Sequence, residues 1–274
     1  MAYKRILTIQ DISCLGQCSM TVALPIMSAC GHEVCILPSA LLSTHTGGFD
    51  KPAVTDLTSS LEGIWQHWRR EKITFDAIYT GYLGSIESIN IANQIMDELL
   101  APGGVVIVDP AMADHGKLYR GFDEAYADAM KTLCMRADIM IPNVTEAAMF
   151  AGVPYRENFD EVYIYDILQK LGGNDIVLTG VGFEPDKTGV AIRSEKKCSY
   201  YFHERIARSY HGTGDMFAAA FTGALMRGRS VYNSVHIASE FTCQCIRNTF
   251  ESPAHWYGVK FETALPLLNK MLGE

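Results

Sequence analysis

The segment His211-Gly212-Thr213-Gly214-Asp215 has the residue types that chemistry on an anion requires, and a helix-forming run begins directly after it at Met216. Two glycines allow backbone N–H groups to converge on a negative group at the positive end of a helix. A carboxylate at the same place can take a proton from a hydroxyl held beside that anion. The alternative interpretation is ordinary capping, in which Thr213 or Asp215 bonds the first N–H groups of the helix.

Other chemical motifs are missing from the sequence. It contains no G-x4-G-K-[ST] phosphate loop, no G-x-G-x-x-G after the first apolar run and no G-x-S-x-G elbow, which disfavours P-loop enzymes, dinucleotide enzymes and α/β-hydrolases. Its eight cysteines are scattered through apolar segments rather than grouped in C-x-x-C pairs. This spacing predicts reduced thiols and no zinc site.

Short apolar runs alternate with amphipathic segments along the chain and must position these residues. Strands are predicted at 5–10, 33–37, 77–80, 105–109, 139–142 and 176–180. Helices are predicted at 18–30, 52–70, 85–100, 126–135, 145–151, 163–171, 214–226, 231–248 and 261–272. Residues 189–193 and 199–204 alternate apolar and polar around a charged turn, which predicts an antiparallel edge hairpin.

This order predicts a three-layer α/β fold. Its central sheet is mostly parallel, with helices on both faces, because near-continuous apolar strands are typical of burial on both sides. The sequence shows no linker or internal repeat, so we expect a single domain over 1–274. In such sheets ligands bind beyond the carboxyl ends of the strands, and the segments that follow the predicted strands are polar. A cleft at that edge is therefore expected.

Composition narrows the class of protein. The 274 residues are 48% hydrophobic and 20% charged, and the formal net charge is -8. These values disfavour a disordered chain, and the acidic balance argues against nucleic acid or an anionic membrane as a partner. The first ten residues do not form a signal peptide, and no stretch reaches the roughly 18 apolar residues of a membrane span. A soluble, cytoplasmic protein is expected.

Six motifs, each following a predicted strand except the last, give the chain a recognisable pattern. Together they resemble the pyridoxal kinase family of the ribokinase-like superfamily over essentially the whole chain. The motifs are Ile9-Gln10, Leu42-Ser43-Thr44-His45-Thr46-Gly47, Gly81-Tyr82-Leu83-Gly84-Ser85, Val108-Asp109-Pro110, Pro142-Asn143-Val144-Thr145-Glu146 and Gly212-Thr213-Gly214-Asp215.

The resemblance implies a kinase that uses ATP and Mg²⁺ to phosphorylate the 5'-hydroxymethyl group of a vitamin B6 vitamer: pyridoxal, pyridoxine or pyridoxamine. It also implies a homodimer, and it leaves open whether a monovalent cation is required. It implies that Asp215 is the catalytic base. It also implies an anion hole formed by Gly212, Thr213 and Gly214, and a substrate pocket lined by His45, Thr46, Gly81 and Tyr82. The residues implied to contact ATP or Mg²⁺ are Asp109, Asp114, Asn143, Glu146 and Thr179. Of these, Asn143, Glu146 and Asp109 would hold the ion through water. Tyr210 precedes the glycine segment closely enough to reach the same substrate.

Asp11 departs from the family pattern, in which serine and histidine follow Ile-Gln. In the family this position faces the substrate ring, so an acceptor-only carboxylate would change the choice of substrate. The alternative is that Asp11 caps the loop before the 18–30 helix. An aspartate here also fits the related hydroxymethylpyrimidine kinases of thiamine synthesis. A non-catalytic binding protein of the same fold is a third alternative, against which the presence of Asp215 argues.

Overall fold

The structure is a computed structural model that describes residues 3–208, 210–252 and 254–273. It divides into two compact units. The first comprises the chain up to Gly104 and from Ile206 onward, and the second is Val105–Arg205. Each unit is described by itself. The single domain expected over the whole chain stays a prediction.

The first unit is built on β1 (Arg5–Ser13). β2 (Glu33–Leu42) and β4 (Phe75–Thr80) pair with it in parallel on either side, and the short β3 (Val54–Asp56) runs antiparallel to the end of β2. Ile6, Leu7 and Ile9 are completely buried. A strand with no exposed apolar residue needs cover on both faces, which is why its sequence is a continuous apolar run.

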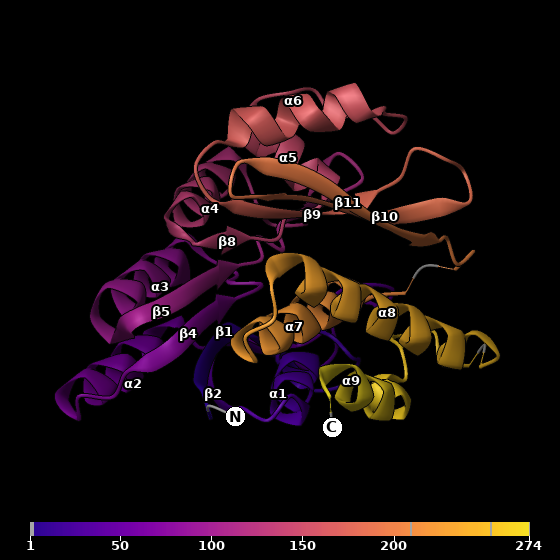
Figure 1. Cartoon of the computed structure of the whole chain (residues 1–274). Helices are drawn as coiled ribbons and strands as arrows, with labels where there is room; N and C mark the ends of the chain where they lie inside the picture. The colour runs from indigo at the N-terminus through magenta and orange to yellow at the C-terminus, as the bar shows by residue number, and fades with distance from the viewer. Residues whose placement is uncertain (1–2, 209, 253, 274) are drawn as a thin grey trace. The chain divides into compact units, whose positions relative to one another are not determined.

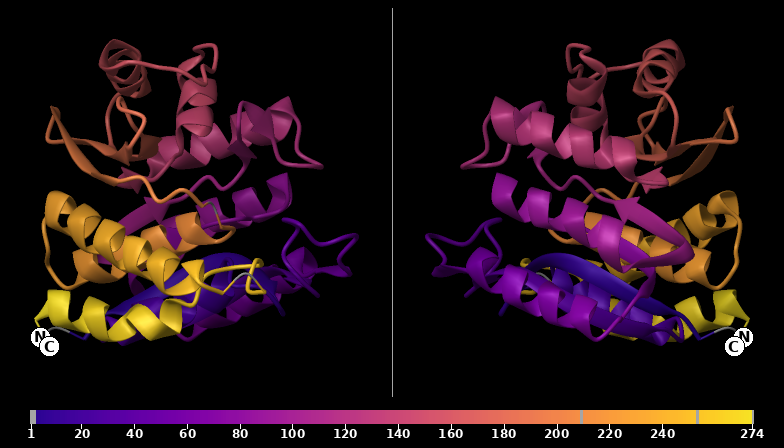
Figure 2. Two further views of the ribbon diagram at one scale, coloured as in Figure 1. Left: turned by 90° about the vertical axis from the view of Figure 1, so that its right-hand side faces the viewer. Right: turned by 90° about the vertical axis from the view of Figure 1, so that its left-hand side faces the viewer.

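Helices cover both faces of this sheet, as the front view and the two side views show (Figures 1 and 2). On one face lie α1 (Met20–Ala29), α7 (Thr213–Met226), α8 (Val231–Phe250) and α9 (Leu265–Leu272), and on the other α2 (Thr58–Arg70) and α3 (Ile86–Leu99). A 3-10 turn, Phe261–Ala264, precedes α9. Every residue of α7 from Met216 to Ala224 is buried. A helix enclosed in this way holds its first turn in a fixed position.

The second unit has five strands in the order β5-β8-β9-β10-β11. The first three pair in parallel, and β9, β10 and β11 are antiparallel. The strands are β5 (Leu100–Val108), which begins in the first unit, β8 (Ile139–Met140), β9 (Asp175–Val181), β10 (Lys187–Ser194) and β11 (Lys197–Glu204). The helices are α4 (Glu124–Arg136), α5 (Val144–Ala151) and α6 (Glu161–Leu171), and a small hairpin joins β6 (Ala113–Asp114) to β7 (Lys117–Leu118).

The predicted fold class is confirmed: parallel strands dominate, helices accompany them, and an antiparallel hairpin ends the sheet. The hairpin turns at Glu195 and Lys196, whose φ angles of 50° and 64° are those of a two-residue turn with both residues left-handed. Among the described residues, no helix is long and apolar enough to cross a membrane.

Several predicted elements differ from the structure. The strand predicted at 33–37 continues to Leu42, and the strand predicted at 105–109 begins at Leu100. Residues 52–57 are not helical: β3 occupies 54–56, and α2 starts at Thr58, whose N–H donates to Asp56 Oδ1 at 2.7 Å. All three residues of β3 are exposed, so they carry no periodic signal of burial. β1 continues three residues beyond the predicted end at Gln10, so Asp11 lies within the strand rather than after it.

Candidate active site

The start of α7 lacks a side-chain cap. Its N-cap is Gly212, with a left-handed φ of 78°, and no side chain accepts from the first turn. Thr213 Oγ1 instead donates to the carbonyl oxygen of Tyr210 at 3.2 Å. The capping interpretation of Thr213 and Asp215 is therefore wrong. The 14-residue helix keeps a polar, positive end suited to an anion.

Only glycine fits at position 212. A Cβ atom there would collide with the backbone carbonyl oxygen of Gln17, and the left-handed φ already disfavours any other residue. Gly214 has open space around its missing Cβ and is exposed. The two glycines therefore differ: one is required by the close approach of two backbone segments, and the other leaves room for a ligand.

Asp215 stands in the first turn of α7 and is half-buried. Its carboxylate accepts from the backbone N–H of Ser19. Burial, followed by the neighbouring charge of Asp11, raises the pKa of Asp215 to about 6. A carboxylate with a pKa near the working pH is well matched to taking a proton from a hydroxyl.

Asp11 is 4% exposed. Ser13 Oγ donates to Asp11 Oδ2 at 3.2 Å, and the Ser19 side chain also hydrogen-bonds the carboxylate. Burial raises the pKa of Asp11. Burial and the charge of Asp11 also raise the pKa of Tyr82. The structure thus brings together Asp11, Tyr82 and Asp215, three of the residues predicted from the sequence.

His45 is buried, and both of its ring nitrogens bond the backbone. Nε2 lies 2.7 Å from the carbonyl oxygen of Tyr257, so this nitrogen carries the proton, and Nδ1 accepts from Gly47 N at 3.1 Å. Burial lowers the pKa of His45, in keeping with a neutral ring. Any substrate would therefore meet the ring of His45 rather than its nitrogens. The neighbouring Thr46 side chain is exposed.

An aromatic cluster surrounds His45. The ring centroids of His45 and Phe49 are 5.0 Å apart, those of Phe49 and Trp256 are 4.7 Å apart, and the His45 ring is 5.2 Å from that of His211. Sequence reasoning missed Phe49 and Trp256. No sequence spacing joins residues 49 and 256, so only the fold could reveal their contact.

Gly81 and Tyr210 complete the predicted substrate residues of the first unit. Gly81 N donates to Ile9 O at 3.1 Å, and a Cβ on Gly81 would come within 2.6 Å of the Gln10 side-chain oxygen. Gly81 thus leaves room for the Gln10 side chain beside the strand ends. Tyr210 is 5% exposed, and its hydroxyl has no hydrogen-bond partner among the described residues.

In the second unit Asn143 and Glu146 form a capping box at the start of α5. Asn143 Oδ1 accepts from Glu146 N at 3.0 Å, and Glu146 Oε2 accepts from Asn143 N at 2.9 Å. The box also holds another segment: Glu146 Oε1 accepts from Met112 N at 2.8 Å, and Asn143 Nδ2 donates to Ala113 O at 2.7 Å. The pair therefore fastens residues 112–113 to α5.

The other predicted nucleotide residues flank this box. Asp109 follows β5 and accepts from Ala111 N at 3.1 Å, and Asp114 is exposed on the hairpin that Glu146 holds. Thr179 is half-buried on β9, with its N–H donating to Pro142 O at 2.9 Å. Its bridge to Asn143 brings Thr179 beside the start of α5.

Glu146 does not fit direct coordination of Mg²⁺. Both carboxylate oxygens accept backbone N–H groups, the side chain is 1% exposed, and burial raises its pKa to about 7. Asn143 uses its oxygen and its amide nitrogen within the box. The described residues contain no group of three or more His, Cys, Asp or Glu able to hold a metal ion. Of the predicted set, the carboxylates of Asp109 and Asp114 have the oxygen chemistry that suits a hydrated Mg²⁺.

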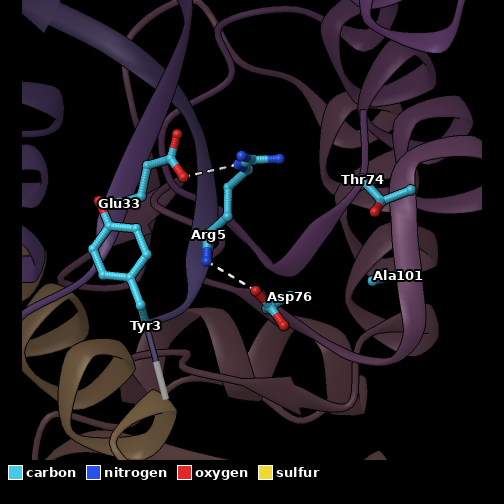
Figure 3. A pocket seen from close by; sticks show the side chains of 6 residues that line it. All are labelled: Tyr3, Arg5, Glu33, Thr74, Asp76 and Ala101. Atoms are coloured by element: carbon cyan, nitrogen blue, oxygen red, sulfur yellow. Dashed lines mark hydrogen bonds and ion pairs between the residues drawn. The ribbon is translucent and has the colours of Figure 1, made fainter. Parts of the chain in front are cut away.

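A pocket of about 250 Å³ lies elsewhere in the first unit, at the opening residues of the strands (Figure 3). At its wall Arg5 Nε pairs with Glu33 Oε2 at 2.9 Å, and Arg5 N donates to Asp76 Oδ2 at 2.9 Å. None of the predicted site residues lines it. The pocket lies at the N-terminal ends of the strands, whereas Asp11 and Gly81 lie at their C-terminal ends.

Comparisons with known proteins identify the class of protein to which this chain belongs. Residues 63–259 match the family model described as phosphomethylpyrimidine kinase. The solved pyridoxal kinase of Lactobacillus plantarum is 32% identical, with 98% of both chains covered and a TM-score of 0.90. A Bacteroides thetaiotaomicron protein named as a phosphomethylpyrimidine kinase, solved with pyridoxal, is 33% identical over 98% of this chain and 96% of its own, with a TM-score of 0.91.

Curated relatives divide between the same two names. The hydroxymethylpyrimidine/phosphomethylpyrimidine kinase of Bacillus subtilis is 28% identical over 65% of this chain and 66% of its own length. The pyridoxine/pyridoxal/pyridoxamine kinase of Bordetella avium is 27% identical over 89% of this chain and 85% of its own.

The fold and these similarities define a ribokinase-like phosphotransferase that acts on a hydroxyl group. Within that class the chain belongs to the pyridoxal kinase family.

Proposed function

We propose that this enzyme transfers the γ-phosphoryl group of ATP to the 5'-hydroxymethyl group of a vitamin B6 vitamer. The observation that carries the proposal is Asp215, a carboxylate with a pKa of about 6 in the uncapped first turn of α7. Pyridoxal as the substrate class is supported by the similarity to the Lactobacillus plantarum kinase and to the Bacteroides protein solved with pyridoxal.

In this proposal Asp215 accepts the proton of the hydroxymethyl group as its oxygen attacks phosphorus. The N–H groups at residues 212–214 bind the oxygens of the transferred group, which gathers charge in the transition state. The buried Tyr210, the half-buried Tyr82 and the face of the His45 ring are proposed to contact the vitamer. The close fit of Gly212 against Gln17 keeps the N–H groups in place before substrate arrives.

The proposed nucleotide contacts belong to the second unit. Asp109, Asp114 and Thr179 are proposed to contact the nucleotide phosphates or their hydrated metal. Mg²⁺, when bound, would neutralise charge on the phosphates. Asn143 and Glu146 are proposed to hold the 112–113 segment, since their own oxygens are already engaged. A monovalent cation, a homodimer and a cytoplasmic location stay predictions.

Hydroxymethylpyrimidine is the second candidate substrate. The Bacillus subtilis relative and the matching family model favour it, and its acceptor is likewise a hydroxymethyl group on a heterocycle. The two candidates share the reaction chemistry and differ only in the ring. Turnover by a panel of substrates therefore separates them.

The test measures ADP release at fixed ATP and Mg²⁺ with pyridoxal, pyridoxine, pyridoxamine and hydroxymethylpyrimidine. We expect a higher kcat/KM with at least one B6 vitamer than with the pyrimidine. Asp215→Asn, which keeps the size but removes the basicity, should lower kcat about 10²–10⁴-fold. Glu33→Gln, at the far end of the sheet, is the matched control and should retain activity. A preference for the pyrimidine would reverse the substrate assignment, and an active Asp215→Asn enzyme would remove the base.

A further inference from the structure

We propose that Asp11 is a positioning residue for Asp215, a second buried carboxylate that is joined to it through Ser19. The inference rests on the proposed role of Asp215. It gives a task to the residue that departs from the family pattern. It also differs from the expectation that Asp11 contacts the substrate.

Ser19 is the shared partner of the two carboxylates. Its side chain hydrogen-bonds Asp11, and its backbone N–H donates to Asp215. Ser19 is the N-cap of α1 and has a positive φ of 50°, which is uncommon for a residue other than glycine. It also forms a β-bridge with Ile12, the residue after Asp11. Both the side chain and the backbone of Ser19 therefore tie β1 to the start of α7.

No ion pair neutralises the two negative charges. Among the described residues, no Lys, Arg or His forms an ion pair with Asp11 or Asp215. The first turn of α1 has no acidic residue, and its last turn has no basic one. The other titratable groups that face the pair are Cys18 and Tyr82, whose pKa values are raised by burial and by these carboxylates. Nearby like charge makes each carboxylate hold its proton more strongly.

The hydrogen bonds of the Asp11 carboxylate separate this role from substrate recognition. Asp11 is 4% exposed, and two serine hydroxyls already engage its carboxylate. A carboxylate engaged in this way acts through its charge. That effect is the same for every substrate. Loss of Asp11 should therefore lower kcat/KM by a similar factor for every vitamer. A contact with the ring or its substituents would instead give losses that differ between pyridoxal and pyridoxamine.

The test begins without turnover. In the apo protein labelled with ¹³C at aspartate carboxyl carbons, the Asp215 signal is identified by its loss in Asp215→Asn and titrated by NMR. We expect a lower titration midpoint for Asp215 in Asp11→Asn and in Asp11→Ser, which also removes the charge. Glu33→Gln removes a charge from the opposite end of the same sheet and should leave the midpoint unchanged. An unchanged midpoint in the folded Asp11 variants would overturn the inference while leaving the proposed function intact.

The second measurement is the pH dependence of kcat for the same variants. The acid limb should move to lower pH in the Asp11 variants, with a plateau loss smaller than the about 10²–10⁴-fold loss from removing the base itself. The loss of kcat/KM should be alike for pyridoxal, pyridoxine and pyridoxamine. If the NMR midpoint moved and the acid limb did not, Asp215 would not be the base. Unequal losses across the panel would instead assign Asp11 to substrate choice.

Discussion

At the scale of single residues, the two glycines at the start of α7 have different tasks. The left-handed Gly212 lies against the Gln17 backbone, whereas Gly214 has no atom within 4 Å of a Cβ position. We expect Gly212→Ala to lower the thermal midpoint, because the left-handed conformation costs about 1–2 kcal/mol and the added methyl must displace Gln17. The measurement is thermal unfolding, with Gly214→Ala as its matched control. Equal midpoints for the two variants would contradict the distinction.

Residue types and order were enough to predict that Asp215 and its glycines lie at a helix start, because this local pattern needs no tertiary information. They were not enough to predict what His45 does. The sequence shows a histidine after a strand, but only the fold shows that the Tyr257 carbonyl oxygen and Gly47 N–H engage both of its nitrogens. The same holds for Phe49, which packs on a residue more than 200 positions away.

At the scale of elements, the start of α5 is fastened to residues 112–113 by the Glu146 carboxylate together with the Asn143 amide. Gln at position 146 would turn one acceptor oxygen into an N–H donor facing a backbone N–H. We therefore expect Glu146→Gln to lower the free energy of unfolding by about 0.5–2 kcal/mol, the range of a lost cap. It should also raise the Mg²⁺ concentration for half-maximal rate, because the segment between Asp109 and Asp114 loses its anchor.

The matched control for Glu146→Gln is Asp160→Asn at the start of α6. Asp160 caps its helix by accepting a hydrogen bond from Tyr163 N at 2.9 Å. Denaturant unfolding and the Mg²⁺ dependence of the rate are measured for both variants. The control should leave the Mg²⁺ dependence unchanged. If Glu146→Gln also left it unchanged, Glu146 would act as a helix cap alone.

Elements with a buried face were predictable, and those without one were not. The strands at 5–10 and 77–80 and the helix at 163–171 were predicted within three residues of the observed ends, since the core imposes their apolar pattern. β3 and the β6–β7 hairpin are two or three residues long and are held by backbone pairing, which leaves no periodic trace in the sequence. The extension of β1 through Ser13 likewise follows from its pairing with β2.

At the scale of the whole molecule, the carboxylates with raised pKa values set how stability changes with pH. Burial raises the pKa of Asp215 to about 6 and that of Glu146 to about 7, and it also raises the pKa of Asp11. Between the unfolded and folded values the folded chain binds more protons than the unfolded chain does. The stabilising contribution of each group is thus present at about pH 4 and is lost as the pH rises through its folded pKa.

Asp215→Asn tests this pH dependence of stability directly. Asparagine is neutral at every pH and its oxygen can still accept from Ser19 N–H, so the variant avoids the cost of ionising a buried group. We expect it to be more stable than the wild type at pH 8, by on the order of 1–2 kcal/mol, with the gain shrinking toward pH 4. Denaturant unfolding at pH 4, 6 and 8 measures the difference.

The control for this experiment is Asp76→Asn. Burial acts to raise the pKa of Asp76, but the hydrogen bonds from Lys4 and the Arg5 N–H, with the charges of both residues, together outweigh it and lower the pKa. The contribution of the Asp76 carboxylate to stability is present above its pKa in the unfolded chain and is lost only as the pH falls through its lower pKa in the folded chain. Asp76→Asn should therefore be less stable than the wild type at both pH 6 and pH 8. A catalytic base such as Asp215 is expected to lower the stability of the fold, because function rather than stability selects its carboxylate. An Asp215→Asn enzyme less stable than the wild type at pH 8 would show instead that the Asp215 charge stabilises the fold.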